Sequence, residues 1–173
     1  MRDDLLALKD YDLWANRLLL GSLAPLPHED YVRELGGGWP SLRSTLVHLA
    51  GATRAWAERF DGRDATVLPT VEEVPTLADA ARMLNEADER IAAFLAGATP
   101  ERLAAPLVWK NLKGEPKAAP LWTVLRHTVN HATYHRGQLA AMLRRLGVAP
   151  AATDLVRWAI ERHAAGAFGR GTP

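Results

Sequence analysis

The chain has 173 residues, which predicts a single domain, because a domain usually holds roughly 100–200 residues. Apolar residues make up 48% of it, enough for a real core and too many for extended disorder. Twenty-one Lys and Arg against 20 Asp and Glu leave a formal net charge of +1, so charge does not favour nucleic-acid binding. The absence of cysteine excludes disulfides, thiolate metal ligands and a cysteine nucleophile. Any metal here needs nitrogen or oxygen ligands, and any thiol must come from outside.

The first residues do not resemble a targeting signal. Arg2, Asp3 and Asp4 precede a short apolar stretch that Lys9 and Asp10 interrupt, whereas a signal peptide needs a longer uncharged run. No segment approaches the roughly 20 apolar residues of a membrane helix. We therefore expect a cytoplasmic protein with no membrane partner.

Apolar periodicity predicts three helices in the first hundred residues. Ser41 is the expected N-cap of the second helix, because it follows Pro40 and precedes an apolar stripe. Thr76 and Asp79 resemble a capping box at the start of the third. The expected helices are about Asp4–Leu23, Ser41–Asp61 and Thr76–Gly97.

The second half begins with a stretch, Arg102–Ala119, that has few helix signals and is expected to form a short hairpin or an extended loop. A long fourth helix is predicted at about Leu121–Leu146, where Gly147 ends it. A shorter helix is predicted from Thr153 or Asp154 to Ala165.

These elements predict an all-α fold, a four-helix bundle with a short extra C-terminal helix. Loops of roughly 15–20 residues between the helices argue against a simple up-down-up-down order. We expect one domain over residues 1–166 and a flexible tail over residues 167–173.

Three histidines follow one another at intervals of four on the fourth predicted helix: His127, His131 and His135. Side chains four residues apart meet on one face of a helix, so two imidazoles at this spacing can bind one metal ion. The same spacing also occurs on solvated faces and between core residues. The pattern is therefore necessary for a metal pair but does not establish one.

His48 lies in the middle of the second predicted helix. Alone, it is more typical of a buried histidine with its hydrogen bonds satisfied than of a metal ligand. Joined to a pair on another helix, it completes a set of three, the number of protein ligands that catalytic zinc sites commonly have. Three histidines without a carboxylate also suit nickel, iron or copper.

The run His131-Ala-Thr-Tyr-His135-Arg136-Gly137-Gln138 resembles the H-x-x-x-H-R-G-Q signature of the DinB/YfiT-like superfamily. Further resemblances occur in the family's order along nearly the whole chain. They lie at Tyr11–Asn16, Ser44–His48, Asn111–Gly114, Leu125–Asn130, Gly147, Pro150 and Thr153–Leu155.

This resemblance implies a four-helix bundle with up-down-down-up topology, often dimeric. It implies a divalent metal, zinc or nickel before others, held by His48, His131 and His135. Members of the family belong to DNA-damage or stress regulons, and relatives are metal-dependent S-transferases that use low-molecular-weight thiols. Because fold transfers more safely than function, the substrate stays open.

Two further residues near the pair have alternative interpretations. His127 is a candidate fourth ligand or proton relay, or a histidine that only supports the ligands from one turn away. Arg136 is a candidate contact for an anionic substrate, or a helix arginine that is solvated or paired with a carboxylate.

Three functions remain open on this evidence. The first is a thiol S-transferase, in which the metal lowers the pKa of an external thiol acting on a small-molecule substrate. The second is a hydrolase, in which the metal activates water and His127 is the base. The third is a non-enzymatic, stress-induced metal-binding protein. DNA binding is disfavoured by the near-neutral charge.

Overall fold

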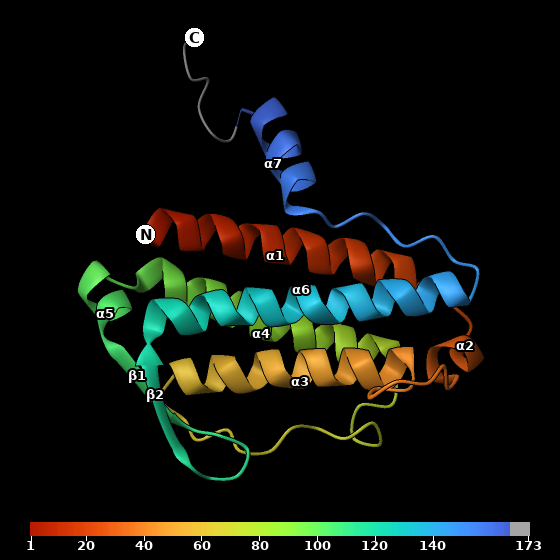
Figure 1. The fold of residues 1–173 in the computed structure, drawn as a ribbon, viewed down its shortest axis with the longest axis horizontal. Helices are drawn as coiled ribbons and strands as arrows, with labels where there is room; N and C mark the ends of the chain where they lie inside the picture. The colour runs from red at the N-terminus through yellow and green to blue at the C-terminus, as the bar shows by residue number, and fades with distance from the viewer. Residues whose placement is uncertain (167–173) are drawn as a thin grey trace.

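The long helices of the molecule lie side by side, as the ribbon of a computed structural model shows (Figure 1). The structure describes residues 1–166; the tail predicted for residues 167–173 lies outside them. The elements are α1 (Arg2–Leu23), α2 (His28–Val32), α3 (Leu42–Phe60), α4 (Leu77–Gly97), α5 (Pro100–Ala104), β1 (Pro106–Lys110), β2 (Pro116–Pro120), α6 (Leu121–Arg145) and α7 (Leu155–Ala164).

The four long helices, α1, α3, α4 and α6, form the bundle (Figure 1). Chain direction reverses between α1 and α3, is kept between α3 and α4, and reverses again at α6. Residues 61–76 make this possible by returning along the length of α3 before α4 begins. The expected four-helix bundle with up-down-down-up order is confirmed, and α7 is the expected extra helix.

Local signals explain where the helices begin. Ser41 caps α3 in a reciprocal capping box with Ser44, so each side chain accepts a hydrogen bond from the other residue's backbone N–H. Thr76 caps α4 by accepting from the backbone N–H of Asp79. The four long helices therefore start within a few residues of their predicted positions.

Two short helices and the hairpin refine the sequence-based expectation. The loop predicted after α1 contains α2, and α5 overlaps a stretch in which no helix was expected. Pro100 lies in the first turn of α5 and Thr99 caps it, a combination that favours helix initiation. Between α5 and α6, β1 and β2 pair antiparallel, with Val108 opposite Ala118, so the hairpin alternative is confirmed.

The apolar stripes of the helices meet in two main clusters. One surrounds Leu46, Leu84 and Leu139 at one end of the bundle, and the other surrounds Ile91 and Leu121 at the end that carries the hairpin. A smaller cluster joins α7 to α1 through Trp158 and Tyr11. Together they hold α3 and α6 side by side, which positions the candidate site between them.

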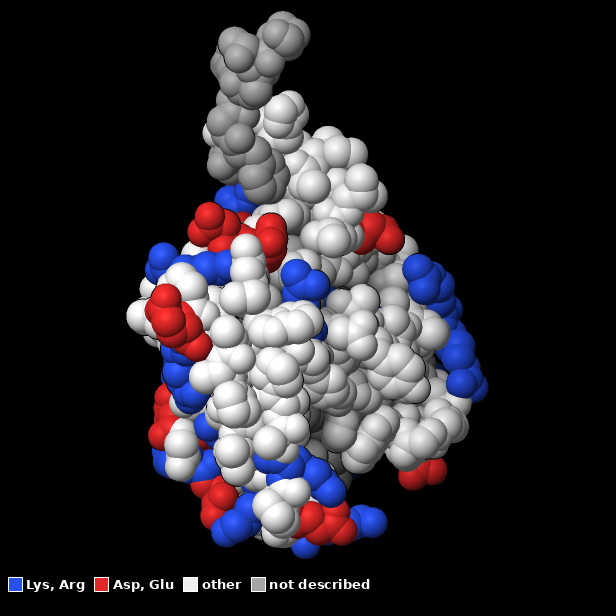
Figure 2. All heavy atoms as spheres, turned by 60° about the vertical axis from the view of Figure 1, so that its left-hand side comes forward, with Lys and Arg blue, Asp and Glu red and all other residues white. Residues whose placement is uncertain are grey.

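Charged side chains on the face shown in Figure 2 alternate in sign along the left and lower rim, whereas the middle of that face carries few charges. No helix among the described residues is long and apolar enough to cross a membrane.

Candidate metal centre

Three of the predicted site residues come together where α3 meets α6. His48 projects from α3, and His131 and His135 project from successive turns of α6. Each offers a ring nitrogen, and these nitrogens all lie within 4.8 Å of one another. His135 is buried, whereas His48 and His131 are partly accessible. The structure thus places the three histidines as a candidate metal-binding group.

The spacing of the nitrogens in this group suits a bound metal ion. Nε2 of His131 lies 3.1 Å from Nε2 of His135. Two imidazoles bound to tetrahedral zinc would place their nitrogens about 3.3 Å apart. Nδ1 of His48 is buried and has no hydrogen-bond partner, a cost that a bound ligand can remove.

Gln138 orients one of the ligands. Its Oε1 lies 2.8 Å from Nδ1 of His135, one turn further along α6. With Nδ1–H as the donor, Nε2 of His135 keeps its lone pair and faces His131. This hydrogen bond therefore selects the tautomer that a metal ion requires.

The surroundings keep the three rings neutral. Burial, and then the neighbouring His135, lower the pKa of His48 to about 4. Burial and the nearby histidines lower the pKa of His131 to about 4 as well. Burial also lowers the pKa of His135, although its hydrogen bond to Gln138 opposes the shift. Neutral imidazole is the form that binds metal, so the group is ready to bind near pH 7 without losing protons.

Aromatic rings surround the histidines. The indole of Trp39 stacks on His48 with ring centres 4.2 Å apart and planes 22° apart. Tyr134 presents an edge to His135 at 5.1 Å. Sequence reasoning did not single out Trp39. The signal that could have found it is its position just before the Pro40–Ser41 start of α3, the helix that carries His48.

His127 lies one turn before His131, with ring centres 5.7 Å apart. Its ring also meets the edge of Trp56 at 5.5 Å, and partial burial lowers its pKa. His127 is not among the three residues whose nitrogens converge. It therefore lies beside the group, in a place compatible with either of its non-ligand roles.

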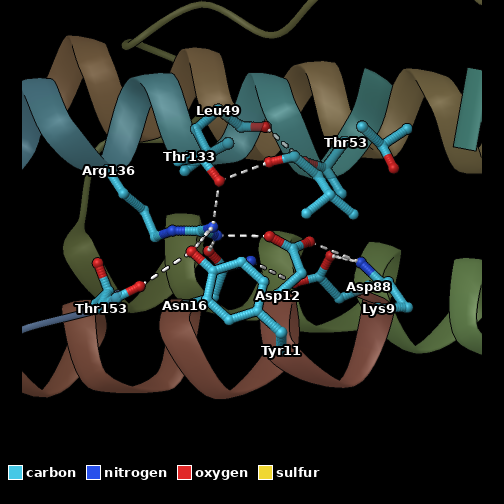
Figure 3. Close-up of polar contacts among 12 residues, drawn as sticks. Lys9, Tyr11, Asp12, Asn16, Leu49, Thr53, Asp88, Thr133, Arg136 and Thr153 are labelled. Carbon is cyan, nitrogen blue, oxygen red and sulfur yellow. Dashed lines mark hydrogen bonds and ion pairs between the residues drawn. The ribbon is translucent and has the colours of Figure 1, made fainter. Parts of the chain in front are cut away.

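Arg136 is directed away from the histidines. Arg136 is only 2% exposed. Its guanidinium donates hydrogen bonds to Oδ1 of Asp12 at 2.5 Å and to Oδ1 of Asn16 at 2.8 Å, and both of these residues lie on α1 (Figure 3). A further hydrogen bond goes to Thr133 on α6 itself. The placement matches the carboxylate-paired alternative for Arg136, because a guanidinium held by buried partners is not offered to a substrate.

The cluster around Arg136 extends to α4. The ammonium of Lys9 bonds Asp12 at 3.1 Å and Asp88 at 2.5 Å, and Asn16 donates to the other oxygen of Asp88 (Figure 3). Burial alone would lower the pKa of Lys9, but the two carboxylates outweigh it and raise the pKa. We call Lys9, Asp12, Asn16, Asp88 and Arg136 the buried ion cluster; it links α1, α4 and α6.

Two cavities differ in their relation to the histidines. One of about 350 Å³ lies between residues 38–48 and residues 68–72, and His48 forms part of its wall. A larger one of about 980 Å³ lies between α1 and α4 and is lined by none of the three histidines. Only the smaller of these two adjoins the candidate metal centre, so it is the one relevant to chemistry there.

Nearly the whole chain is similar in sequence to known proteins. The model of the DinB family matches residues 1–163. The chain belongs to the DinB family. Protein DinB of Bacillus subtilis is 33% identical over 161 residues, which cover 89% of this chain and 92% of that protein.

A solved structure shares the fold of this DinB-family chain. It is YfiT from Bacillus subtilis, described as a probable metal-dependent hydrolase with an unusual four-helix bundle topology. The TM-score is 0.65, the identity is 15%, and the match covers 86% of this chain and 89% of YfiT. At this identity the likeness concerns the fold.

Proposed function

We propose that His48, His131 and His135 bind one divalent metal ion, zinc or nickel, and that the protein is a thiol S-transferase using an external low-molecular-weight thiol. The observation that carries this proposal is the all-imidazole composition of the converging group. Three neutral ligands leave the full charge of a divalent ion uncompensated, which favours an anionic fourth ligand such as a thiolate.

Different residues of the chain have different roles in this proposal. The three histidines hold the ion, Gln138 fixes the tautomer of His135, and the indole of Trp39 covers one face of His48. When bound, a divalent metal lowers the pKa of a coordinated thiol and so supplies a nucleophile at neutral pH. The chain contains no cysteine, so that thiol is a co-substrate and the electrophile is a second small molecule.

A metal-dependent hydrolase is the second candidate. The position of His127 beside His131 favours it, because a neutral imidazole next to the ion can accept a proton from water. The description of YfiT as a probable metal-dependent hydrolase points the same way. In this alternative His127 is the proton relay.

A thiol panel tests the proposal. Zinc-loaded and nickel-loaded protein would be given a fluorogenic chlorinated electrophile with each of several bacterial thiols, and conjugation would be followed by fluorescence. We expect metal-dependent conjugation with at least one thiol, and none with the His131→Ala variant. Ester or amide cleavage without thiol would instead favour the hydrolase. Metal binding with neither activity would favour a non-enzymatic metal-binding protein of the stress response.

Family membership also motivates expectations about assembly and location. We propose a homodimer in the cytoplasm with a small-molecule substrate and no nucleic-acid partner. Light scattering coupled to size-exclusion chromatography checks the first of these, since a monomeric mass would contradict it.

A further inference from the structure

The cavity of about 350 Å³ beside His48 is lined mainly by apolar surface. The indole of Trp39 forms one side, and Val47 and Val71 contribute aliphatic surface. Because Trp39 also stacks on His48, a molecule in this cavity would lie next to a proposed metal ligand. A flat apolar group suits such a wall, since aromatic rings stack favourably on indole.

The position of the outer wall depends on a glycine in α3. Gly51 follows His48 by about one turn, and the ring of Pro69 packs directly onto its Cα. A Cβ at residue 51 would overlap with Cδ of Pro69, which is part of a stiff ring with little room to move. Glycine at this position therefore lets residues 68–72 lie close beside His48 and keeps the cavity narrow.

One charged side chain lines this cavity. It is Glu72, which is exposed and, within residues 1–166, has no hydrogen bond or ion pair that would neutralise it. No lysine or arginine lines the same cavity. An unpaired carboxylate at the rim of an apolar cavity attracts cations and repels anions.

We propose that this cavity is a substrate subsite selecting a small organic cation, with its apolar body against Trp39 and its positive group toward Glu72. This inference rests on the proposed function in that the cavity adjoins the proposed metal centre. It adds a substrate class, ammonium-bearing aromatic or aliphatic molecules, and names Glu72 as the residue that sets charge preference. Trp39 adds a cation–π contribution to the same preference.

Three probes of similar shape test the charge preference: benzyltrimethylammonium, benzyl alcohol and phenylmethanesulfonate. The quaternary ammonium has no lone pair, so it cannot act as a metal ligand. Binding to the metal-free full-length protein, in which only the cavity's own charges act on the probes and no metal ion can coordinate the alcohol or the sulfonate, would be followed by the ¹H–¹⁵N signal of the Trp39 indole, assigned with Trp39→Phe. We expect the dissociation constant of the cation to be roughly threefold below that of the alcohol, and the sulfonate to bind most weakly.

Glu72→Gln should make the cation and the alcohol bind equally, because it removes the charge and keeps the shape. Glu86→Gln is the matched control, since Glu86 is exposed on α4 and does not line the cavity. Gly51→Ala should weaken all three probes by displacing Pro69, with zinc stoichiometry unchanged.

The outcomes separate the two proposals. Equal affinity for cation and sulfonate, or no shift of the Trp39 signal with any probe, would overturn the subsite while zinc binding still stood. Loss of zinc binding alone would overturn the proposed function, and the probes can still be measured on that protein. Retained cation preference in Glu72→Gln would show that Glu72 does not set it.

Discussion

Helix α6 contributes residues to two polar clusters that differ in how their buried groups are compensated. The buried ion cluster on one side pairs two cations, Lys9 and Arg136, with two carboxylates, Asp12 and Asp88. The histidines on the other side carry no charge near pH 7 and lack full hydrogen bonding, as the orphaned Nδ1 of His48 shows. His135 and Arg136 are neighbours in the chain, yet they belong to different clusters.

The difference separates a structural cluster from a candidate functional one. The charges of Lys9, Asp12, Asp88 and Arg136 neutralise one another, so this cluster has little charge to offer a ligand, although Nε of Arg136 has no hydrogen-bond partner. Neutral rings that converge and leave a buried nitrogen of His48 without a partner cost stability unless something binds them, and such sites are where function is expected. The following predictions test whether the two clusters differ in this way.

The largest effect is expected at the histidines. His131→Ala should reduce bound zinc from about one ion per chain to nearly none, because two imidazoles bind far less tightly than three. Elemental analysis after dialysis measures this. His163→Ala, on the exposed surface of α7, serves as the control and should keep full stoichiometry. Full occupancy in His131→Ala would contradict the proposed site.

The buried ion cluster should respond through stability instead. Asp12→Ala leaves Arg136 and Lys9 buried with too little negative charge, which should lower the free energy of unfolding by about 3–5 kcal/mol. Urea denaturation measures it. Asp10→Ala removes a half-exposed pair with Arg162 and should cost less than about 1 kcal/mol. Equal costs for the two variants would show that the cluster is not a buried structural unit.

Gln138 allows a finer comparison, because it touches a proposed ligand without being one. Gln138→Leu should weaken zinc affinity by about ten- to a hundredfold, or roughly 1.4–2.8 kcal/mol, since His135 loses the partner that fixes its tautomer. Competition with a chelating dye measures the affinity. Asn130→Leu, at an exposed position of α6, should leave it unchanged. An unaffected affinity in Gln138→Leu would remove Gln138 from the site.

The smallest effect concerns pH. His48 and His131 have a pKa of about 4 in the folded protein and about 6.5 when unfolded, so the unfolded chain binds more protons between these values. The metal-free protein should therefore lose stability as pH falls from 6.5 to 4, by on the order of 1 kcal/mol after solvent screening. Thermal unfolding across this range measures it. His131→Ala should flatten the slope; an unchanged slope would place the titration elsewhere.

Much of the site was visible in the sequence because helix periodicity is a local property. The spacing of four puts His131 and His135 on one face of α6, and the family signature connects them to His48. The role of Arg136 was less visible, although a signal existed. Arg136 lies on the apolar stripe of α6 four residues after Ala132, and Asp12 and Asn16 occupy equivalent core positions on α1.

The sequence by itself determined the four long helices, their caps and the pair of His131 and His135, because each depends on periodicity or on residues close in the chain; the family resemblance added His48 and the order of the helices in the bundle. Only the tertiary structure decided which partners those helices present to one another. It paired Arg136 with Asp12 rather than with a substrate, stacked Trp39 on His48, and packed Pro69 on Gly51 to form the cavity beside it. These contacts join residues from different elements, and long-range packing decides them where local propensity cannot.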